Sequence, residues 1–401
     1  MKKTLFVATA VLVLAAGAAQ AEVAVKLGVL SDMSSLYADI GGQGSVEAAK
    51  MAVEDFDPAK NGMKVDVISA DHLNKPDVGA GIARQWYDVD KVDAIVDVPT
   101  SSVALAISEI TKEKNKVFLA SGPASSDLTG SKCTPNNVHW TYDTWALAHG
   151  TGGAIVKQGG DTWFFLTADY AFGHALERDT SDVVKAAGGK AVGAVNVPLN
   201  TSDFSSFLLQ AQSSKAKIVG LANAGGDTIN SIKQAAEFGI VQGGQKLAGL
   251  LVFISDVHSL GLQTAQGLTI TTAFYWDLND KTRAWSQRFA KRNNGRYPTM
   301  VQAGVYSATF HYLEAVKQVG SAADGSKVVG AMKAAKIDDP LFGPTEVRVD
   351  GRAVHEMYLV EVKKPDESKA PYDYYKIMAT IKPEDAFRPL AEEKGICPLV
   401  N

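Results

Sequence analysis

The stretch LGVLSDMSSLYADIGGQGSVEAAKMAVEDF, residues 27–56, decides the fold. It starts inside an apolar run, Val23–Leu30, which has the length and composition of a buried strand. After a polar loop, Ser45–Phe56 places apolar residues at helical spacing. A buried strand followed by a loop and an amphipathic helix is typical of the first unit of a parallel α/β sheet.

The same alternation continues along the chain in two runs. In the first run we expect strands at 64–70, 94–98 and 117–120, and helices from Pro76 towards Trp86 and over 103–113. In the second run we expect helices at 147–158, 172–187, 204–213 and 228–238, and strands at 162–167, 191–197, 218–222 and 247–254. Strands separated by helices imply parallel sheets covered on both faces, so two runs imply two sheets.

The end of the chain breaks this rhythm. A strand is predicted at 268–272, and helical patterns dominate from 281 to 335. Asp350-Gly351 separates two alternating apolar runs, 346–349 and 357–362, which predicts a hairpin between them. The remaining residues, 363–401, are charged and interrupted by four prolines, so we expect an extension that wraps over the surface and forms no domain.

The first residues indicate export. Lys2 and Lys3 precede a short apolar stretch, 5–16, and the small-residue cleavage pattern Ala19-Gln20-Ala21 follows. We therefore predict a signal peptide over residues 1–21 and a periplasmic mature protein. The alternative is a membrane-anchoring helix, but the apolar stretch is shorter than the ~20 residues that a membrane span needs.

Composition limits the partners and the size of the fold. The chain has 401 residues, which favours about two domains at ~100–200 residues each. Its net charge of −4 argues against a nucleic-acid or anionic-membrane partner, because either would favour a basic face. We expect a monomer.

Two cysteines, Cys133 and Cys397, are present. In an oxidising compartment two otherwise unexplained thiols usually pair, and this pair would attach the C-terminal tail to a loop near mid-chain. Two separate free thiols are the alternative.

The sequence carries no recognised catalytic motif. It has no G-x-S-x-G elbow and no phosphate-binding G-x-x-x-x-G-K-[ST] loop, and its seven histidines lack zinc-site spacing. Asp227 and Asp256 could act as acid and base, but no pattern pairs them. We therefore expect no metal, no cofactor and no enzymatic activity, while a hydrolase working in a crevice stays the alternative.

The loops at the carboxyl ends of the predicted strands suggest a binding site, because ligands of open α/β sheets lie there. In the first run these loops, 31–37, 100–102 and 121–126, are rich in hydroxyl groups and several precede helices. Hydroxyls and free helix N–H groups together suit a carboxylate, although each Ser or Thr alone could be only a helix cap. The equivalent loops of the second run, 169–173, 222–227 and 255–258, offer aromatic, small and acidic residues for the rest of a small ligand.

Taken together, these features resemble the periplasmic solute-binding components of branched-chain amino-acid-type ABC transporters. The resemblance rests on residues 27–56 and on ASGPASSDLTG, FFLTADYAFG, DFSSFLLQAQSSKAKIV and VYSATFHYLEAV. It implies a type I periplasmic-binding (Venus-flytrap) architecture, in which two Rossmann-like α/β lobes with parallel central sheets are joined by three hinge crossings. Residues 23–142 plus 276–337 would form the N-terminal lobe, 143–273 plus 338–362 the C-terminal lobe, and 363–401 the extension.

The resemblance also implies a ligand site. In the family the first lobe holds the ligand carboxylate, a role that falls by position to Ser102 and to the loop from Gly122 to Ser125. Tyr37 would flank the pocket, and Phe172 stands where the family has a stacking aromatic residue. Asp256 falls where amino-acid binders keep an acidic residue for the ammonium group, and Asn223 is small where leucine binders have aromatic residues.

We thus expect hinge closure on a small carboxylate ligand and delivery of that ligand to an ABC permease in the inner membrane. A branched-chain amino acid and another small monocarboxylate, such as a keto or aromatic acid, both stay open as ligands. Loop 121–128 is one residue shorter than in the amino-acid binders, which leaves the residue match there open. A sensory module is a further alternative, although no signalling domain accompanies these residues.

Overall fold

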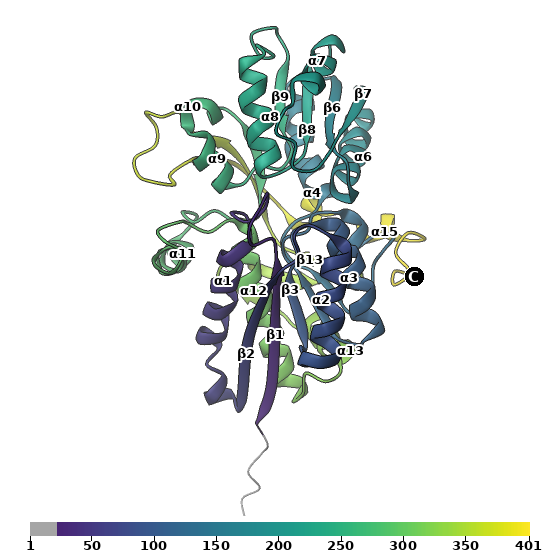
Figure 1. The fold of residues 1–401 in the computed structure, drawn as a ribbon, viewed down its shortest axis with the longest axis vertical. Coiled ribbons are helices and arrows are strands. Elements are labelled where there is room, and N and C mark those ends of the chain that lie inside the picture. Colours follow the sequence, from purple (N-terminus) through teal and green to yellow (C-terminus); the bar gives the residue numbers. More distant parts are fainter. Residues whose placement is uncertain (1–21) are drawn as a thin grey trace, which may run out of the picture.

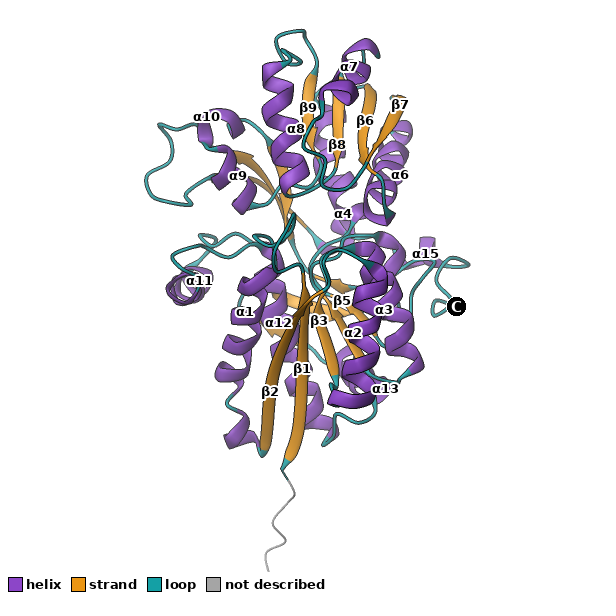
Figure 2. Ribbon diagram, in the orientation of Figure 1, coloured by secondary structure: helices purple, strands orange, loops and turns teal. Residues whose placement is uncertain are grey.

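Two α/β lobes make up the molecule (Figure 1). The computed structural model describes residues 22–401, so the predicted signal peptide, residues 1–21, lies outside the described residues. Each lobe has its own parallel sheet, which confirms the predicted fold class. Figure 2 shows helices on both sides of each sheet.

The first lobe is built on a five-stranded parallel sheet with the order β2-β1-β3-β4-β5. Its strands are β1 (Val23–Ser31), β2 (Met63–Asp71), β3 (Ala94–Asp97), β4 (Val117–Ala120) and β5 (Asn137–His139). Its helices are α1 (Gly42–Phe56), α2 (Pro76–Gln85), α3 (Ser101–Glu113), α11 (Asp280–Arg292), α12 (Met300–Val319) and α13 (Gly325–Ala334), with the turns η1 (Pro58–Asn61), η2 (Trp86–Asp90) and η3 (Ser126–Leu128).

Alternate residues of β1 explain why its sequence is almost continuously apolar. Leu27 and Val29 belong to the core that includes α1 and α12, whereas Leu30 belongs to a second core with α2 and α3. Successive side chains of a strand point to opposite faces, so a strand covered on both faces needs apolar residues at nearly every position.

The second lobe repeats the plan with a four-stranded parallel sheet, ordered β7-β6-β8-β9. Its strands are β6 (Thr162–Ala168), β7 (Lys190–Val197), β8 (Ile218–Ala222) and β9 (Lys246–Gly249). Its helices are α4 (Thr144–Leu147), η4 (Ala148–Gly152), α5 (Gly153–Lys157), α6 (Ala171–Ala186), α7 (Ser205–Ser213), α8 (Gly226–Glu237), α9 (Ile254–Leu260) and α10 (Leu262–Ala265).

Two small antiparallel sheets complete the fold. One has the order β10-β14-β15, from β10 (Thr269–Thr272), β14 (Met357–Val362) and β15 (Tyr375–Ile381). The other has the order β11-β12-β13, from β11 (Ile337–Asp339), β12 (Gly343–Val347) and β13 (Ala353–Val354). The chain then ends with the short helices α14 (Pro383–Ala386) and α15 (Leu390–Glu393).

The turn at Asp350-Gly351 joins different strands from those we predicted. β12 pairs with β13, whereas 357–362 pairs with β10 and β15. Residues 338–354, which we assigned to the second lobe, pack on the first lobe. The carboxylate of Asp339 accepts hydrogen bonds from Ser307 at 2.6 Å and His311 at 2.8 Å, both on α12. The N–H of His139 on β5 also donates to the carbonyl of Gly351 at 2.9 Å, which ties the later part of this segment to the first lobe. A crossing between the lobes therefore follows Val354.

The disulfide between Cys133 and Cys397 is present, as predicted, with the two Cα atoms 5.7 Å apart. The extension is more structured than we expected, since β15 pairs along the whole of β14.

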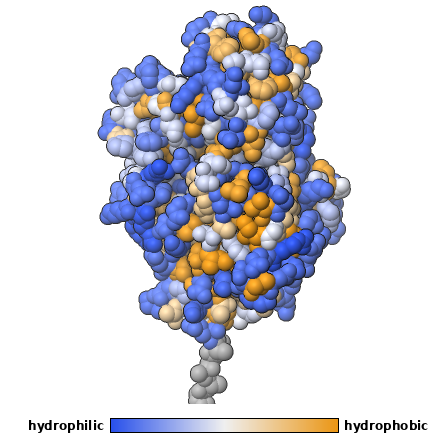
Figure 3. All heavy atoms as spheres, viewed as in Figure 1, coloured by the Kyte–Doolittle hydropathy of each residue, from blue (hydrophilic) through white to orange (hydrophobic). Residues whose placement is uncertain are grey.

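No helix in residues 22–401 combines the length and the apolar character required to cross a membrane. On the face seen in Figure 3, hydrophilic residues predominate and apolar surface gathers over the middle of the molecule.

Candidate functional site

A small cavity lies between the lobes, at the carboxyl ends of the strands of both parallel sheets. Loops that follow β1, β3, β4 and β5 supply its first wall, and loops that follow β6, β8 and β9 supply the second. The lining consists of Tyr37, Ile40, Pro99, Gly122, Ala124, Tyr142, Tyr170, Phe172, Ala224, Leu251 and Phe253. Its volume is only about 10 Å³, close to the smallest space that holds one water molecule. The side chains themselves fill the cleft.

Aromatic rings dominate this cavity and meet across it. The hydroxyl groups of Tyr37, from the first lobe, and Tyr170, from the second, are 2.6 Å apart. The Tyr142 hydroxyl donates to the carbonyl of Gly122 at 2.7 Å, and its ring meets Phe253 edge-on at 6.1 Å. Burial raises the pKa of each of these three tyrosines, so their hydroxyls stay protonated and can donate.

The loop that carries Tyr37 is held by one buried carboxylate, Asp32. Its oxygens accept hydrogen bonds from the backbone N–H of Ser35 at 2.9 Å and of Tyr37 at 2.8 Å, and from the amide of Asn74 at 2.7 Å. Burial alone would raise the pKa of Asp32, but these hydrogen bonds outweigh it and lower the pKa below its ordinary value of 3.8.

We expect Asp32→Ala to lower the free energy of unfolding by about 2–3 kcal/mol, the size of a charge-assisted hydrogen bond. The same ionised group makes stability depend on pH. Because its folded pKa is depressed, its contribution is present above pH 3.8 and is lost as the pH falls through the folded pKa. Urea denaturation at neutral pH and at pH 3 measures both effects. Asp39→Ala is the control. Asp39 lies in the same loop as Asp32 and forms an exposed ion pair with Arg296, so its removal should lower the free energy of unfolding by less than about 1 kcal/mol.

Three long helices begin at the cavity without a side-chain cap. Thr100, Tyr170 and Gly225 precede α3, α6 and α8, and none of these residues caps its helix with a side chain. By contrast, the side chains of Asn279, Thr299 and Asp324 cap α11, α12 and α13. Uncapped N–H groups and the helix dipole attract an anion. The first turns of α3 and α6 contain no acidic residue, whereas α8 has Asp227.

Three buried carboxylates lie behind the cavity walls. Burial raises the pKa of Asp97 and of Asp227 to about 6, and that of Asp256 to about 7. Asp97 accepts a hydrogen bond from the Ser31 hydroxyl at 2.9 Å, and Asp227 accepts one from the N–H of Asn200 at 3.1 Å. None of the three aspartates lines the cavity.

Three of the seven predicted site residues, Tyr37, Gly122 and Phe172, are brought together at the cavity. The other four lie outside its lining. Their role in ligand binding stays a prediction.

Three of the four residues outside the lining, Ser125, Asn223 and Asp256, make hydrogen bonds within the loops that form the walls. Ser102 lies on α3, where the hydroxyl of its neighbour Ser101 accepts from the N–H of Ser125 at 3.1 Å. The amide oxygen of Asn223 accepts from Thr228 at 2.7 Å, at the start of α8. Asp256 accepts from the N–H of Phe253 at 2.9 Å and so fixes the turn that presents this ring.

Sequence reasoning missed Tyr142, Tyr170 and Phe253. Tyr170 stands in a loop that we expected at the crevice, so only the choice of the neighbouring Phe172 left it out. Tyr142 and Phe253 follow β5 and β9, and no motif marks them. The strand ends themselves were the usable signal, because every lining residue lies in the loop after a parallel strand or, for Phe172, in the first turn of the helix that follows it.

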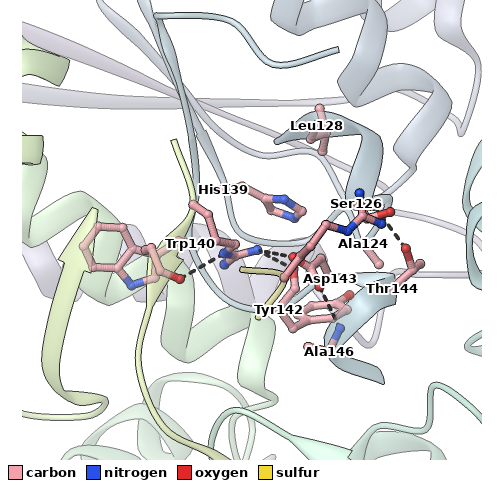
Figure 4. A network of polar contacts seen from close by, with 12 residues as sticks. Ala124, Ser126, Leu128, His139, Trp140, Tyr142, Asp143, Thr144 and Ala146 are labelled. Atoms are coloured by element: carbon pink, nitrogen blue, oxygen red, sulfur yellow. Dashed lines mark hydrogen bonds and ion pairs between the residues drawn. The ribbon is translucent and has the colours of Figure 1, made fainter. Parts of the chain in front are cut away.

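The first crossing between the lobes lies directly behind Tyr142. Figure 4 shows Asp143 capping α4 through the N–H of Ala146 at 2.8 Å, and Thr144 joined to Ser126 of the first lobe at 3.1 Å. Arg352 is fully buried beside them and donates to the carbonyl of Tyr142 at 2.9 Å, with its guanidinium 3.6 Å from the Asp143 carboxylate.

Residues 22–401 contain no group of three or more His, Cys, Asp or Glu side chains placed to hold a metal ion.

Comparison with known proteins identifies the relatives of this arrangement. A family model described as periplasmic binding protein matches residues 24–369. A periplasmic binding protein of Burkholderia mallei has a crystal structure with a TM-score of 0.91 and 53% identity, covering 94% of this chain and 99% of that one. A branched chain amino acid ABC transporter periplasmic ligand-binding protein of Burkholderia xenovorans gives a TM-score of 0.81 and 41% identity, covering 94% of this chain and all of that one. A Leu/Ile/Val-binding protein homolog of Brucella melitensis is 26% identical over 380 residues, which span 92% of this chain and 94% of the relative.

Proposed function

Because the chain belongs to the periplasmic binding proteins of branched-chain amino-acid-type ABC transporters, we propose that it captures a small monocarboxylate with an apolar or aromatic body. The ligand is released unchanged to the membrane permease. The single observation that carries this ligand class is the cavity lining, in which five of the eleven residues are aromatic and none is charged.

The lining favours an aromatic or keto acid over an amino acid. An ammonium group buried in the cavity needs a carboxylate within reach, since an unpaired buried charge is costly. Asp256, the predicted partner, bonds to the backbone of Phe253 and lies outside the lining. Solved neighbours of the same fold from Rhodopseudomonas palustris are complexes with 4-hydroxybenzoate and with benzoate. Such ligands suit a cavity lined by aromatic rings.

The carboxylate is proposed to bind near the start of α3. The uncapped N–H groups of that helix offer donors, and no acidic residue opposes an anion in its first turn. Ser102, which is partly exposed in this turn, keeps its predicted role as a hydroxyl donor. The aromatic body then lies between Tyr37, Tyr142 and Phe172.

Contacts between the lobes support hinge closure. The Tyr37–Tyr170 hydroxyl pair and the hydrogen bond from the N–H of Gly226 to the carbonyl of Leu36, 3.4 Å long, join opposite lobes, and parting of the lobes would break both. The small cavity volume means that a ligand enters only when the lobes part. Binding is therefore a population shift towards a closed state that the permease recognises.

A thermal-shift screen of the mature protein tests the ligand class. Benzoate, 4-hydroxybenzoate, phenylpyruvate, 2-ketoisocaproate and leucine are the probes, and a ligand that prefers the folded state raises the melting temperature. We expect shifts with the aromatic or keto acids. A shift with leucine alone would refute the proposed class.

NMR of the recovered ligand tests the enzymatic alternative, and any chemical conversion would favour that alternative.

We expect Tyr170→Phe to weaken binding of the best probe about two- to tenfold, because it removes one interlobe hydrogen bond of about 0.5–1.5 kcal/mol. Calorimetric titration measures the change. Tyr358→Phe, on β14 of the same lobe, removes a hydroxyl that faces Glu356 at 3.5 Å and is the matched control. Equal effects in both variants would contradict the assigned role of the Tyr37–Tyr170 pair.

A further inference from the structure

The C-terminal strap, which we define as residues 382–401, returns from the second lobe to the first. Just before it, β15 pairs with β14 from Met357↔Ile381 to Val362↔Tyr375, and β14 pairs with β10 of the second lobe. The N-terminal end of the strap, which follows β15, therefore moves with the second lobe.

The first anchor of the strap on the first lobe is a buried ring. Phe387 is 1% exposed, packs edge-on against His355 at 5.4 Å, and lies under the guanidinium of Arg352 at 4.8 Å. The guanidinium of Arg348 donates to the carbonyl of Arg388 at 2.7 Å, while the side chain of Arg388 lies 3.7 Å from the carboxylate of Asp179 on α6 of the second lobe. Only residues 382–386 separate the end of β15 from this anchor, and four of them form α14.

The second anchor is covalent. Cys397 is bonded to Cys133, in the loop between η3 and β5 of the first lobe. The bond spans 264 residues of sequence, which include the whole parallel sheet of the second lobe. Figure 1 shows α15 and the C-terminus beside the junction of the lobes. The lobes are thus joined by three peptide crossings and by one further connection that the disulfide closes.

We infer that the C-terminal strap is a fourth hinge crossing, and that it limits how far the two lobes part. Opening the cleft pulls β15 away from Phe387, and the five residues between them allow little slack unless α14 unwinds. Cutting or lengthening this connection shifts the protein without ligand towards wider opening. Ligand affinity then falls, because a smaller fraction of molecules is closed. The effect on affinity rests on the proposed hinge closure, whereas the effect on opening does not.

Two variants test the strap. One is Cys133→Ser with Cys397→Ser, which removes the covalent anchor. The other inserts six Gly and Ser residues after Lys382, which lengthens the strap and keeps both cysteines. The control inserts the same six residues after Asp366, in an exposed loop between β14 and β15, two strands of the same sheet. Circular dichroism and thermal unfolding report whether each exported protein folds. If the serine variant does not fold, the Lys382 insertion decides.

Small-angle X-ray scattering without ligand is the deciding measurement. A compact chain of this length has a radius of gyration of about 21 Å. We expect the radius of gyration of both test variants to exceed that of the wild type by on the order of 1 Å. The control should show only the small increase in radius that six added residues cause in a chain of unchanged shape. Titration with benzoate, or with the best probe of the screen, should show about two- to fivefold weaker binding.

An unchanged radius of gyration in the folded test variants, or an equal increase in the control, would overturn the inference. Wider opening without binding of any probe would support the strap and refute the proposed ligand class, so the two failures are distinguishable.

Discussion

Replacing Gly225 with alanine is expected to hold the lobes apart and to weaken ligand binding roughly 5- to 150-fold, which corresponds to about 1–3 kcal/mol of steric conflict in the closed state. A Cβ atom at this position would lie 2.6 Å from the carbonyl oxygen of Leu36 and 3.0 Å from the ring of Tyr37, both on the opposite lobe. The backbone carbonyl cannot rotate away as a long side chain could. Only separation of the lobes relieves the contact, so the variant should favour the open form.

Gly225 also has a backbone conformation, φ 57° and ψ −132°, that residues with a Cβ rarely adopt. Gly239→Ala separates this strain from the interlobe conflict, because Gly239 has φ 66° in the same lobe but its Cβ would meet only a glutamine side chain at 3.8 Å. Titration with the best probe and scattering without ligand measure binding and opening. Loss of affinity in both variants alike would show that strain within the lobe, and not closure, is responsible.

Arg352→Met is expected to lower the free energy of unfolding by about 3–5 kcal/mol, the cost of removing one partner from a buried charged pair. The guanidinium is 0% exposed, and it donates to the carbonyls of Tyr142 at 2.9 Å and Ala353 at 2.9 Å. Methionine fills a similar volume but leaves both carbonyls and the carboxylate of Asp143 without this donor. Burial already raises the pKa of Asp143 and Arg352 opposes that rise, so the variant should shift this carboxyl further towards its neutral form.

Urea denaturation followed by tryptophan fluorescence measures this loss. Arg84→Met is the matched control, since Arg84 pairs with Glu113 at 3.5 Å and both side chains are more than half exposed. Such a surface pair should contribute less than about 1 kcal/mol. A loss in Arg352→Met no larger than in the control would show that the hinge does not depend on this buried cation.

The elements that sequence reasoning located best are those whose burial leaves a local pattern. β1, α1 and α12 are apolar at the spacing of their own secondary structure, so each could be predicted from neighbouring residues alone. The disulfide was predicted on a different ground, because two cysteines in a protein that is expected to be exported have only one possible pairing. The turn at Asp350-Gly351 was also predicted, but its partner strand was not.

The candidate site was predicted only in part, because it is assembled from loops that lie far apart in the sequence. Strand ends identified the loops of Tyr37, Gly122 and Phe172, since the carboxyl ends of parallel strands share one edge of a sheet. Which side chain of a loop faces the cavity depends on local backbone geometry. That is why Tyr170 reaches Tyr37 while Ser102 and Asn223 stay within their own lobes.

The sequence by itself determined the alternation of strands and helices, the two lobes and the family, because these depend on periodic burial and on motifs that are local in the chain. Only the tertiary structure decided the cluster of aromatic side chains at the cavity, the placement of Arg352 behind Tyr142, and the packing of Phe387 against Arg352. Each of these joins residues that are close in space and distant in sequence. Such contacts depend on how the packed elements are arranged in space and leave no spacing by which a single sequence reveals them.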